Sequence, residues 1–351
     1  MDLQYESLSN IDLTDEFFNT LREDYKGFDN WFRLKSEAGE RAYVLRKMSG
    51  DIQGFLYLKI ENEESSDIVP VLPKARRVKV GTLNINAHGT RLGQRFIKKM
   101  LDWAVVQDAG ELYVTVFEKH EPLIKLLVRY GFVKWGVKNS ESGQESVYLK
   151  KIGRVVGEVE KDYPVLDASN NIFLLAIYPK FHTKLFPDSI LNTEAPDIIK
   201  DVSSSNSIHK IFLSNIDGVE DLRAGDVLII YRTAEGGAAE YTAVATSLCV
   251  VEEIRSIHEF HNEQDFLSYA SPYSVFSDAE LKGLWKTKRY PKIVRFTYNV
   301  SLAKRPNRKM LIEQVGIDRN AYAGFMRLTP RQLKEICKLG KINEGLIINQ
   351  A

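Results

Sequence analysis

Cysteine is scarce in this chain, which holds only Cys249 and Cys337 among its 351 residues. The two lie far apart in the sequence and form no metal-ligand spacing. Each sits in an apolar stretch, which favours buried thiols in a reducing compartment.

Long hydrophobic runs and net charge are lacking as well. No apolar segment approaches the roughly 20 residues that span a bilayer, and the acidic N-terminus lacks the basic and apolar regions of a signal peptide. We therefore expect a cytoplasmic protein with no membrane partner. Basic and acidic residues nearly cancel, 48 against 47, so only local clusters of charge can indicate a partner.

Apolar residues are plentiful, at 44% of the chain with 11% aromatics, which makes wholesale disorder a poor description. The length favours two domains. Helical and strand-like segments alternate in the first half, a mixed stretch with Gly and Pro follows, and short strands prevail beyond it. We predict a first domain at 1–152, a linker at 153–168 and a second domain at 169–351.

In the first domain, hydrophobic spacing predicts helices at 14–35, 91–106 and from 121 to about 130. Strands are predicted at 42–46, 55–60, 76–86, 112–117, 133–135 and 147–150. Within the strand at 76–86 the alternation slips by one residue at Gly81-Thr82, which indicates a β-bulge. This order of elements predicts an α/β or α+β domain.

The segment His88–Arg95 (HGTRLGQR) joins the bulged strand to an amphipathic helix. A helix N-terminus offers backbone N–H groups and a favourable dipole to an anion. The segment therefore suits a diphosphate, which is what an acyl-CoA site requires.

With this segment the first domain resembles the GNAT family of N-acetyltransferases, whose signature at this turn is Arg/Gln-x-x-Gly-x-Gly/Ala. Gly93 matches the last glycine, whereas Arg91 stands at the position of the first. Tyr130-Gly131-Phe132 is similar to the Gly-Phe ending of the family's following helix. The resemblance covers about residues 10–150 and implies acetyl-CoA as the cofactor and acetyl transfer to an amine. The cofactor contacts that it implies come from Leu83, Ile85, His88, Gly89, Thr90, Arg91, Leu92, Gly93, Gln94 and Arg95.

The resemblance also bears on catalysis. The family's Asn and Tyr positions align with His120 and Leu127. Leucine cannot donate a proton, so Tyr130, His120 or water would have to act as general acid. Glu118 or His120, just beyond the strand at 112–117, could accept the amine proton. The alternatives are that this turn is simply solvated, and that the domain binds acyl-CoA without catalysis.

In the second domain, strands are predicted at 173–178, 208–214, 226–232, 241–253 and 292–300. A Gly225-Asp226 turn stands at the start of one of them. The arrangement resembles the PUA-like superfamily, most nearly its ASCH and EVE branches, and implies a small β-barrel with helical inserts that is linked to RNA or modified bases. The expected fold class is thus α+β: a GNAT-like mixed sheet with flanking helices, followed by this barrel.

A basic stretch at 281–310 agrees with a nucleic-acid partner. It holds ten Lys/Arg and no Asp or Glu, interleaved with Trp285, Tyr290, Phe296 and Tyr298. Basic groups neutralise phosphates, and aromatic faces stack on unpaired bases. The alternative is that Phe296 and Tyr298 only pack in the core. The predicted nucleic-acid contacts are Lys184, Lys210, Arg232, Lys286, Lys288, Arg289, Tyr290, Lys304, Arg305 and Arg308.

Other polar patterns in the second half leave alternatives open. Tyr178, His182, Lys184 and Asp188 are the residues expected to line a base pocket, if the barrel has one. His258 and His261 have a helical metal spacing without a third ligand, which favours surface histidines and no metal site.

Two functions follow from the sequence, with a third left open. The first is an acetyltransferase that acts on an amine of an RNA-associated substrate. The second is a nucleic-acid-binding regulator whose first half binds acyl-CoA without catalysis. The third is that the barrel has hydrolytic chemistry of its own.

Overall fold

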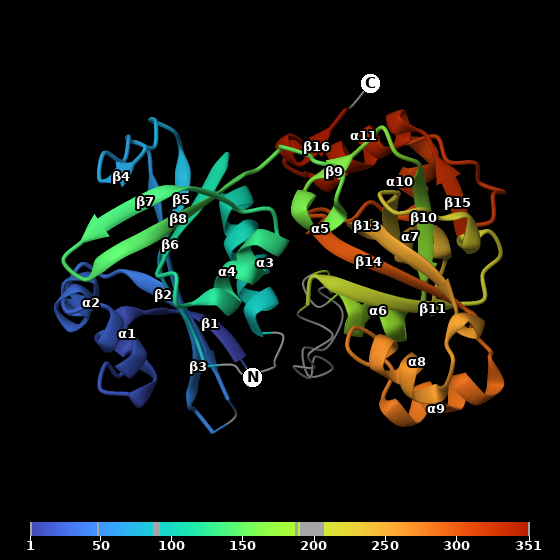
Figure 1. Ribbon diagram of the computed structural model, residues 1–351. Coiled ribbons are helices and arrows are strands. Elements are labelled where there is room, and N and C mark those ends of the chain that lie inside the picture. The colour runs from blue at the N-terminus through green and yellow to red at the C-terminus, as the bar shows by residue number, and fades with distance from the viewer. Residues whose placement is uncertain (1, 48, 87–91, 187–188, 190–206, 350–351) are drawn as a thin grey trace. The chain divides into compact units, whose positions relative to one another are not determined.

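The computed structural model describes residues 2–47, 49–86, 92–186, 189 and 207–349 (Figure 1). Contacts divide the chain into two compact units, Met1–Ile152 and Gly153–Ala351. The stretch 153–168, expected to be a linker, contains α5 (Val159–Asp162) and β9 (Leu166–Asp167). Tyr163 within it is fully buried, so this stretch is a folded part of the second unit.

The first unit is built on an eight-stranded mixed sheet in the order β1-β2-β3-β5-β6-β8-β7-β4. Its strands are β1 (Asp2–Ser7), β2 (Arg41–Arg46), β3 (Ile52–Glu61), β4 (Ile68–Val69), β5 (Arg77–Ile85), β6 (Glu111–Val116), β7 (Val133–Ser140) and β8 (Gly143–Lys151). Its helices are α1 (Asn19–Asp24), α2 (Phe28–Glu37), α3 (Leu92–Val106) and α4 (Glu121–Arg129). The pair β5–β6 is parallel, whereas the other neighbouring strands described in this sheet run antiparallel.

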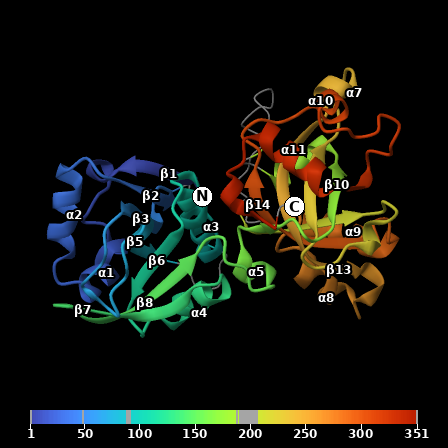
Figure 2. The same cartoon turned by 90° about the horizontal axis from the view of Figure 1, so that it is seen from above.

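Helices cover both faces of this sheet, as Figure 2 shows for α1 and α2 on one side and α3 on the other. Alternation along β3 explains the arrangement, because successive side chains of a strand point to opposite faces. Phe55 packs against Phe18 and Phe32, with ring centroids 5.5 and 6.2 Å away. Its neighbour Gly54 instead lies under the ring of Phe96 from α3.

The helix expected at 14–35 is the largest departure from the sequence prediction in this unit. The structure has a 3-10 turn at Glu16–Phe18, then α1 and α2, separated at Tyr25-Lys26-Gly27. Tyr25 adopts an extended conformation that ends α1, and glycine in a helix interior is unfavourable. The break lets side chains of the 3-10 turn, of α1 and of α2 reach one core cluster, which includes Phe18, Leu21 and Phe32.

The second unit holds a six-stranded mixed sheet in the order β11-β14-β13-β12-β10-β15, and β9 pairs separately with β16. Its remaining strands are β10 (Ile172–Ile177), β11 (His209–Ser214), β12 (Val227–Arg232), β13 (Val244–Ser256), β14 (Lys292–Ser301), β15 (Phe325–Leu328) and β16 (Ile347–Ile348). Its remaining helices are α6 (Pro179–Leu185), α7 (Ala239–Thr242), α8 (Glu263–Ala270), α9 (Asp278–Thr287), α10 (Arg308–Glu313) and α11 (Pro330–Gly340).

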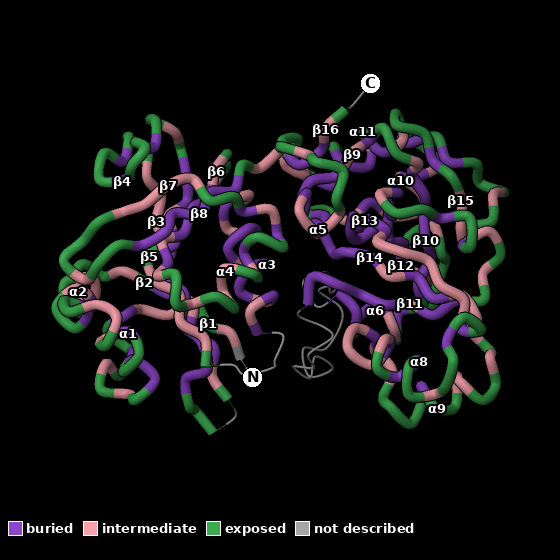
Figure 3. The backbone as a smooth tube through the Cα atoms, viewed as in Figure 1, coloured by how far each residue is buried: buried purple, intermediate pink, exposed green. Residues whose placement is uncertain are grey.

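The predicted barrel is not closed over the residues described. Hydrogen-bonded pairing ends at β11 on one side and at β15 on the other. The central strands are nonetheless deeply buried (Figure 3), and every residue of β10 and β12 is buried. Thr329-Pro330 with Gln332 three residues on is a sequence that favours a capping box, and α11 begins with one: the Thr329 side chain accepts from Gln332 N, and the Gln332 side chain accepts from Thr329 N.

None of the helices in the described ranges has the length and hydropathy that crossing a bilayer would take.

Candidate functional site

The predicted bulge in β5 is confirmed, and it lies where β5 pairs with β3. Tyr57 of β3 pairs with Thr82 and Leu58 with Val80, which leaves Gly81 as the extra residue. Glycine fits this position closely, because an added Cβ would lie 2.6 Å from Cδ1 of the Tyr57 ring. A bulge bends its strand and increases the local twist.

The parallel ladder between β5 and β6 is shorter than the strands themselves. It ends with Val80 opposite Val114, although β5 continues to Ile85 and β6 to Val116. Beyond this pair, the described part of β5 pairs with β3 and that of β6 with β8. Leu83 and Ile85, two predicted cofactor contacts, lie partly exposed on this free length of β5.

The predicted phosphate-binding turn is described only in part. His88, Gly89, Thr90 and Arg91 lie outside the described residues, and α3 is described from Leu92 onward. The remaining members divide by burial: Leu92 and Gln94 are buried, whereas Gly93 and Arg95 are partly exposed.

Gly93 has a packing role that the family resemblance did not suggest. A Cβ added at Gly93 would lie 2.6 Å from Cδ2 of Leu126 on α4. The small residue therefore lets α3 and α4 approach closely near the start of α3.

His120, a predicted catalytic residue, lies in the turn after β6 and is the N-cap residue of α4. Its Nε2 is 2.7 Å from Oδ2 of Asp24, the last residue of α1. The Asp24 side chain is only 8% exposed, whereas that of His120 is 42% exposed. Lys119 also pairs with Asp24, through the other carboxylate oxygen.

The residue after Asp24 joins α1 to a second strand end. Tyr25 donates its hydroxyl to Oε1 of Glu145 on β8, at 2.7 Å, and its ring centroid lies 5.3 Å from that of Phe117. Burial first, and then the Glu145 carboxylate, raise the pKa of Tyr25 well above its usual value. Tyr25 therefore stays protonated and serves as a hydrogen-bond donor.

Glu118, another predicted catalytic residue, is exposed and already engaged. Its Oε1 accepts from Nζ of Lys134 at 2.6 Å and from the hydroxyl of Ser146. The bond from Lys134, followed by that from Ser146, lowers the pKa of Glu118. A carboxylate held in its charged form is a weaker proton acceptor.

Tyr130, the third predicted catalytic residue, lies apart from the other two. It is fully buried just after the C-terminal end of α4, whereas His120 caps the N-terminal end. Ten residues of helical rise, at about 1.5 Å each, put roughly 15 Å between the two backbones. Leu127 is a core residue as well.

Asp24, Tyr25 and Glu145 are the members of this cluster that sequence reasoning missed. Asp24 and His120 are 96 positions apart in the sequence, and Tyr25 and Glu145 are 120 apart. The one local signal was Gly27, which marks the helix break that brings Asp24 and Tyr25 to the end of α1.

The predicted nucleic-acid contacts in the second unit do not all lie at the surface. Lys210 and Arg232 are buried, so they do not lie where a phosphate backbone would meet the protein. The exposed members are Lys184, Lys286, Arg289 and Lys304, and the partly buried ones are Lys288, Tyr290, Arg305 and Arg308.

The aromatic residues of the basic stretch are used largely within the fold. Phe296 and Tyr298 are buried in the core cluster of the sheet, which agrees with the alternative that these two residues only pack in the core. Trp285 stacks on Phe266 with ring centroids 5.6 Å apart, and Tyr290 packs against the same helical cluster. Stacking on bases therefore has less aromatic surface available than the sequence suggested.

The predicted base-pocket residues are also dispersed. Tyr178 is exposed and His182 is fully buried, Lys184 is exposed, and Asp188 lies outside the described residues. His182 Nε2 is 2.8 Å from the Thr246 hydroxyl. Burial, and then the charges of Arg232 and Arg305, lower the pKa of His182 to about 3.

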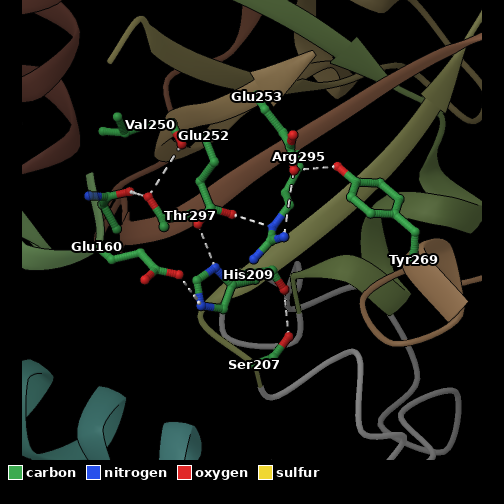
Figure 4. A network of polar contacts seen from close by, with 10 residues as sticks. Glu160, Ser207, His209, Val250, Glu252, Glu253, Tyr269, Arg295 and Thr297 are labelled. Carbon is green, nitrogen blue, oxygen red and sulfur yellow. Dashed lines mark hydrogen bonds and ion pairs between the residues drawn. The ribbon is translucent and has the colours of Figure 1, made fainter. Parts of the chain in front are cut away.

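A polar network that the sequence did not reveal surrounds His209 (Figure 4). The Nδ1 atom of His209 is 2.8 Å from Oε1 of Glu252, and Nε2 is 3.6 Å from Oε1 of Glu160 on α5. These three residues offer ligand atoms within 4.8 Å of one another, as a metal site would. Arg295 Nε, however, lies 2.9 Å from the second oxygen of Glu252, so both oxygens of that carboxylate are already engaged. The histidines with metal spacing in the sequence, His258 and His261, are exposed.

No protein-family model matches the chain, and no curated protein matches it. Solved structures resemble parts of it. A spermidine N-acetyltransferase from Vibrio cholerae is 14% identical, with a TM-score of 0.32 over 43% of this chain and 95% of its own. The NatC complex bound to Gag peptide and CoA contains a chain that is 12% identical, with a TM-score of 0.30 over 43% and 99%. An ASCH protein from Zymomonas mobilis is 10% identical, with a TM-score of 0.32 over 48% and 95%. At these identities and TM-scores the likenesses give this chain neither a family nor an activity.

Proposed function

We propose that the first unit transfers an acetyl group from acetyl-CoA to an amine, and that the second unit selects an RNA-associated substrate. The observation that carries the proposal is the parting of β5 and β6 beyond Val80 and Val114. Ligands of sheets with parallel strands bind outside the carboxyl ends of those strands, where a crevice opens. Here α3 follows the end of β5, and the turn with His120 follows the end of β6.

This edge has the two kinds of group that an acyl-CoA needs. The start of α3, with Leu92–Arg95, would receive the diphosphate on its N–H groups. The free length of β5, from Thr82 to Ile85, would pair with the extended, amide-containing pantetheine arm as an added strand does. The cofactor would supply the thioester that is broken in the reaction.

Of the three predicted catalytic residues, we assign the role of proton acceptor to His120. Glu118 is committed to Lys134 and Ser146, which lower its pKa, and Tyr130 is buried away from the turn. The neutral amine attacks the thioester carbonyl, a C–N bond forms, and the C–S bond breaks. His120 takes the proton that the attacking nitrogen loses and passes it on, to the departing thiolate or to water, so that the charges balance.

The RNA-associated part of the proposal rests on exposed cations of the second unit. Lys184, Lys286, Arg289 and Lys304 remain at the surface, where they would neutralise phosphates. Binding through such contacts should weaken steeply with salt, and the Lys286→Ala/Arg289→Ala double variant should reduce the salt dependence.

The test is calorimetry with acetyl-CoA, followed by a thiol-release assay across pools of amines and RNA-bound substrates. Both protein thiols are buried, and burial raises the pKa of Cys337 to about 12, so the folded protein adds little background. We expect His120→Ala to lower kcat by about 100-fold or more, and Glu118→Gln by less than about threefold. Tight acetyl-CoA binding without thiol release would instead identify a regulator that senses acyl-CoA, and absence of binding would defeat both functions.

A further inference from the structure

The contact between Asp24 and His120 has a chemical consequence for the ring. A carboxylate accepts hydrogen bonds but cannot donate them. The 2.7 Å contact from Nε2 to Oδ2 therefore places the ring hydrogen on Nε2. In the neutral imidazole the other nitrogen, Nδ1, then carries the lone pair.

Asp24 is itself held in place from several sides. Its side chain is 8% exposed, and its second oxygen pairs with Lys119. The next residue, Tyr25, fastens the end of α1 to β8 through Glu145. A carboxylate fixed in this way can set the orientation of a half-exposed imidazole, because the ring has little else to restrain it: as the N-cap residue of α4, His120 makes no side-chain capping bond.

We propose that Asp24 is the positioning residue of the acetyl transfer: it holds His120 in the tautomer with Nδ1 free to accept the amine proton. The inference rests on the proposed function.

The test uses Asp24→Asn in the full chain. Lys119 would retain the amide oxygen, so the amide NH2 would face His120, and Nε2 would have to accept a hydrogen bond. The hydrogen then moves to Nδ1, and the proton acceptor is lost. We expect kcat to fall by about 100-fold or more, with KM for acetyl-CoA changed by less than about twofold, because Asp24 is not among the proposed cofactor contacts.

The spectroscopic readout is the pair of imidazole ¹⁵N chemical shifts of His120, assigned by comparison with His120→Ala. The wild-type ring should show Nε2 protonated and Nδ1 unprotonated at high pH, and Asp24→Asn should invert the pattern. The matched control is Asp67→Asn, which removes a 2.7 Å ion pair between Asp67, just before β4, and Lys138 of β7. This variant should leave both the tautomer and kcat unchanged.

The outcomes separate this inference from the proposed function. If the wild type releases no thiol from acetyl-CoA with any of the amines, the proposed function fails, whereas the ¹⁵N spectrum still decides which nitrogen of His120 carries the hydrogen beside Asp24. If the wild type is active and Asp24→Asn keeps both tautomer and kcat, the positioning role is overturned. If Asp24→Asn does not fold, the wild-type spectrum alone decides, because a hydrogen on Nδ1 would contradict the proposal.

Discussion

At the scale of single residues, burial decides which titratable groups are available for chemistry. His182 was expected near a base pocket, but it is fully buried on α6 and hydrogen-bonded to Thr246. His120 is half exposed and paired with a carboxylate. Two histidines that look equally functional in the sequence thus have different roles, and only His120 lies where a substrate could reach it.

His182 gives a prediction for stability against pH. Its pKa falls from 6.5 to about 3 on folding, because of burial and the charges of Arg232 and Arg305. Between these values the unfolded chain binds a proton that the folded chain does not. The free energy of unfolding is therefore at its full value, as far as His182 is concerned, above about pH 6.5. It decreases as the pH falls towards 3, by about 1 kcal/mol per pH unit.

Urea unfolding of the second unit at pH 7 and pH 5 measures this effect. The loss of stability on acidification should be smaller in His182→Gln than in the wild type. His258→Gln, a change at an exposed histidine, should keep the wild-type loss. An equal loss in His182→Gln would show that His182 does not titrate as burial requires.

At the scale of elements, the sheet of the first unit depends on small residues under its helices. Gly54 on β3 lies against the ring of Phe96, and a Cβ at this position would collide with that ring. Because Phe96 is fully buried in α3, the ring has little room to move. Gly54 therefore sets how closely α3 packs on the sheet.

We predict that Gly54→Ala lowers the free energy of unfolding of the first unit by about 1–3 kcal/mol, as overpacking does. The double variant Gly54→Ala/Phe96→Leu should recover part of that loss, and a double-mutant cycle in urea would measure the coupling. The control is Gly110→Ala, since a Cβ at Gly110 meets nothing within 4 Å. Additive effects in the cycle would contradict the contact.

Much of the element pattern could be predicted from the sequence. The stripe of α3, the bulge at Gly81 and the cap at Thr329 all lie where periodicity and local chemistry indicated. The strands β1 and β4 were not predicted, and β4 is only two residues long. The break between α1 and α2 was also missed, because the aromatic spacing continues across it while Tyr25 turns to meet Glu145.

At the scale of the whole molecule, the question is whether the stretch 153–168 is a linker or a part of the second unit. Tyr163 in this stretch donates to the Tyr298 carbonyl at 3.1 Å, and Glu160 contributes to the network around His209. The strand β9 pairs with β16 near the chain's end. These contacts make the stretch a part of the second unit's fold.

We therefore predict that a fragment of residues 153–351 folds cooperatively, and that a fragment of residues 169–351 is markedly less stable. The shorter fragment would expose the surface that Tyr163 and Leu166 cover, both fully buried in the full chain. Thermal unfolding followed by circular dichroism would compare them, and a fragment of residues 1–152 should fold by itself. If the fragments 153–351 and 169–351 were equally stable, residues 153–168 would be a linker after all.

By itself, the sequence determined what depends on near neighbours: helix and strand periods, the bulge, a capping box and the change of texture between the halves. Each of these follows from side-chain direction and backbone preference within a few positions of the chain. Only the tertiary structure decided which polar residues meet. Two contacts, Asp24–His120 and Tyr25–Glu145, join residues from distant elements. The burial of Lys210 and His182 likewise depends on elements that pack around them. Packing of the sheets, which no local pattern encodes, brings those residues together.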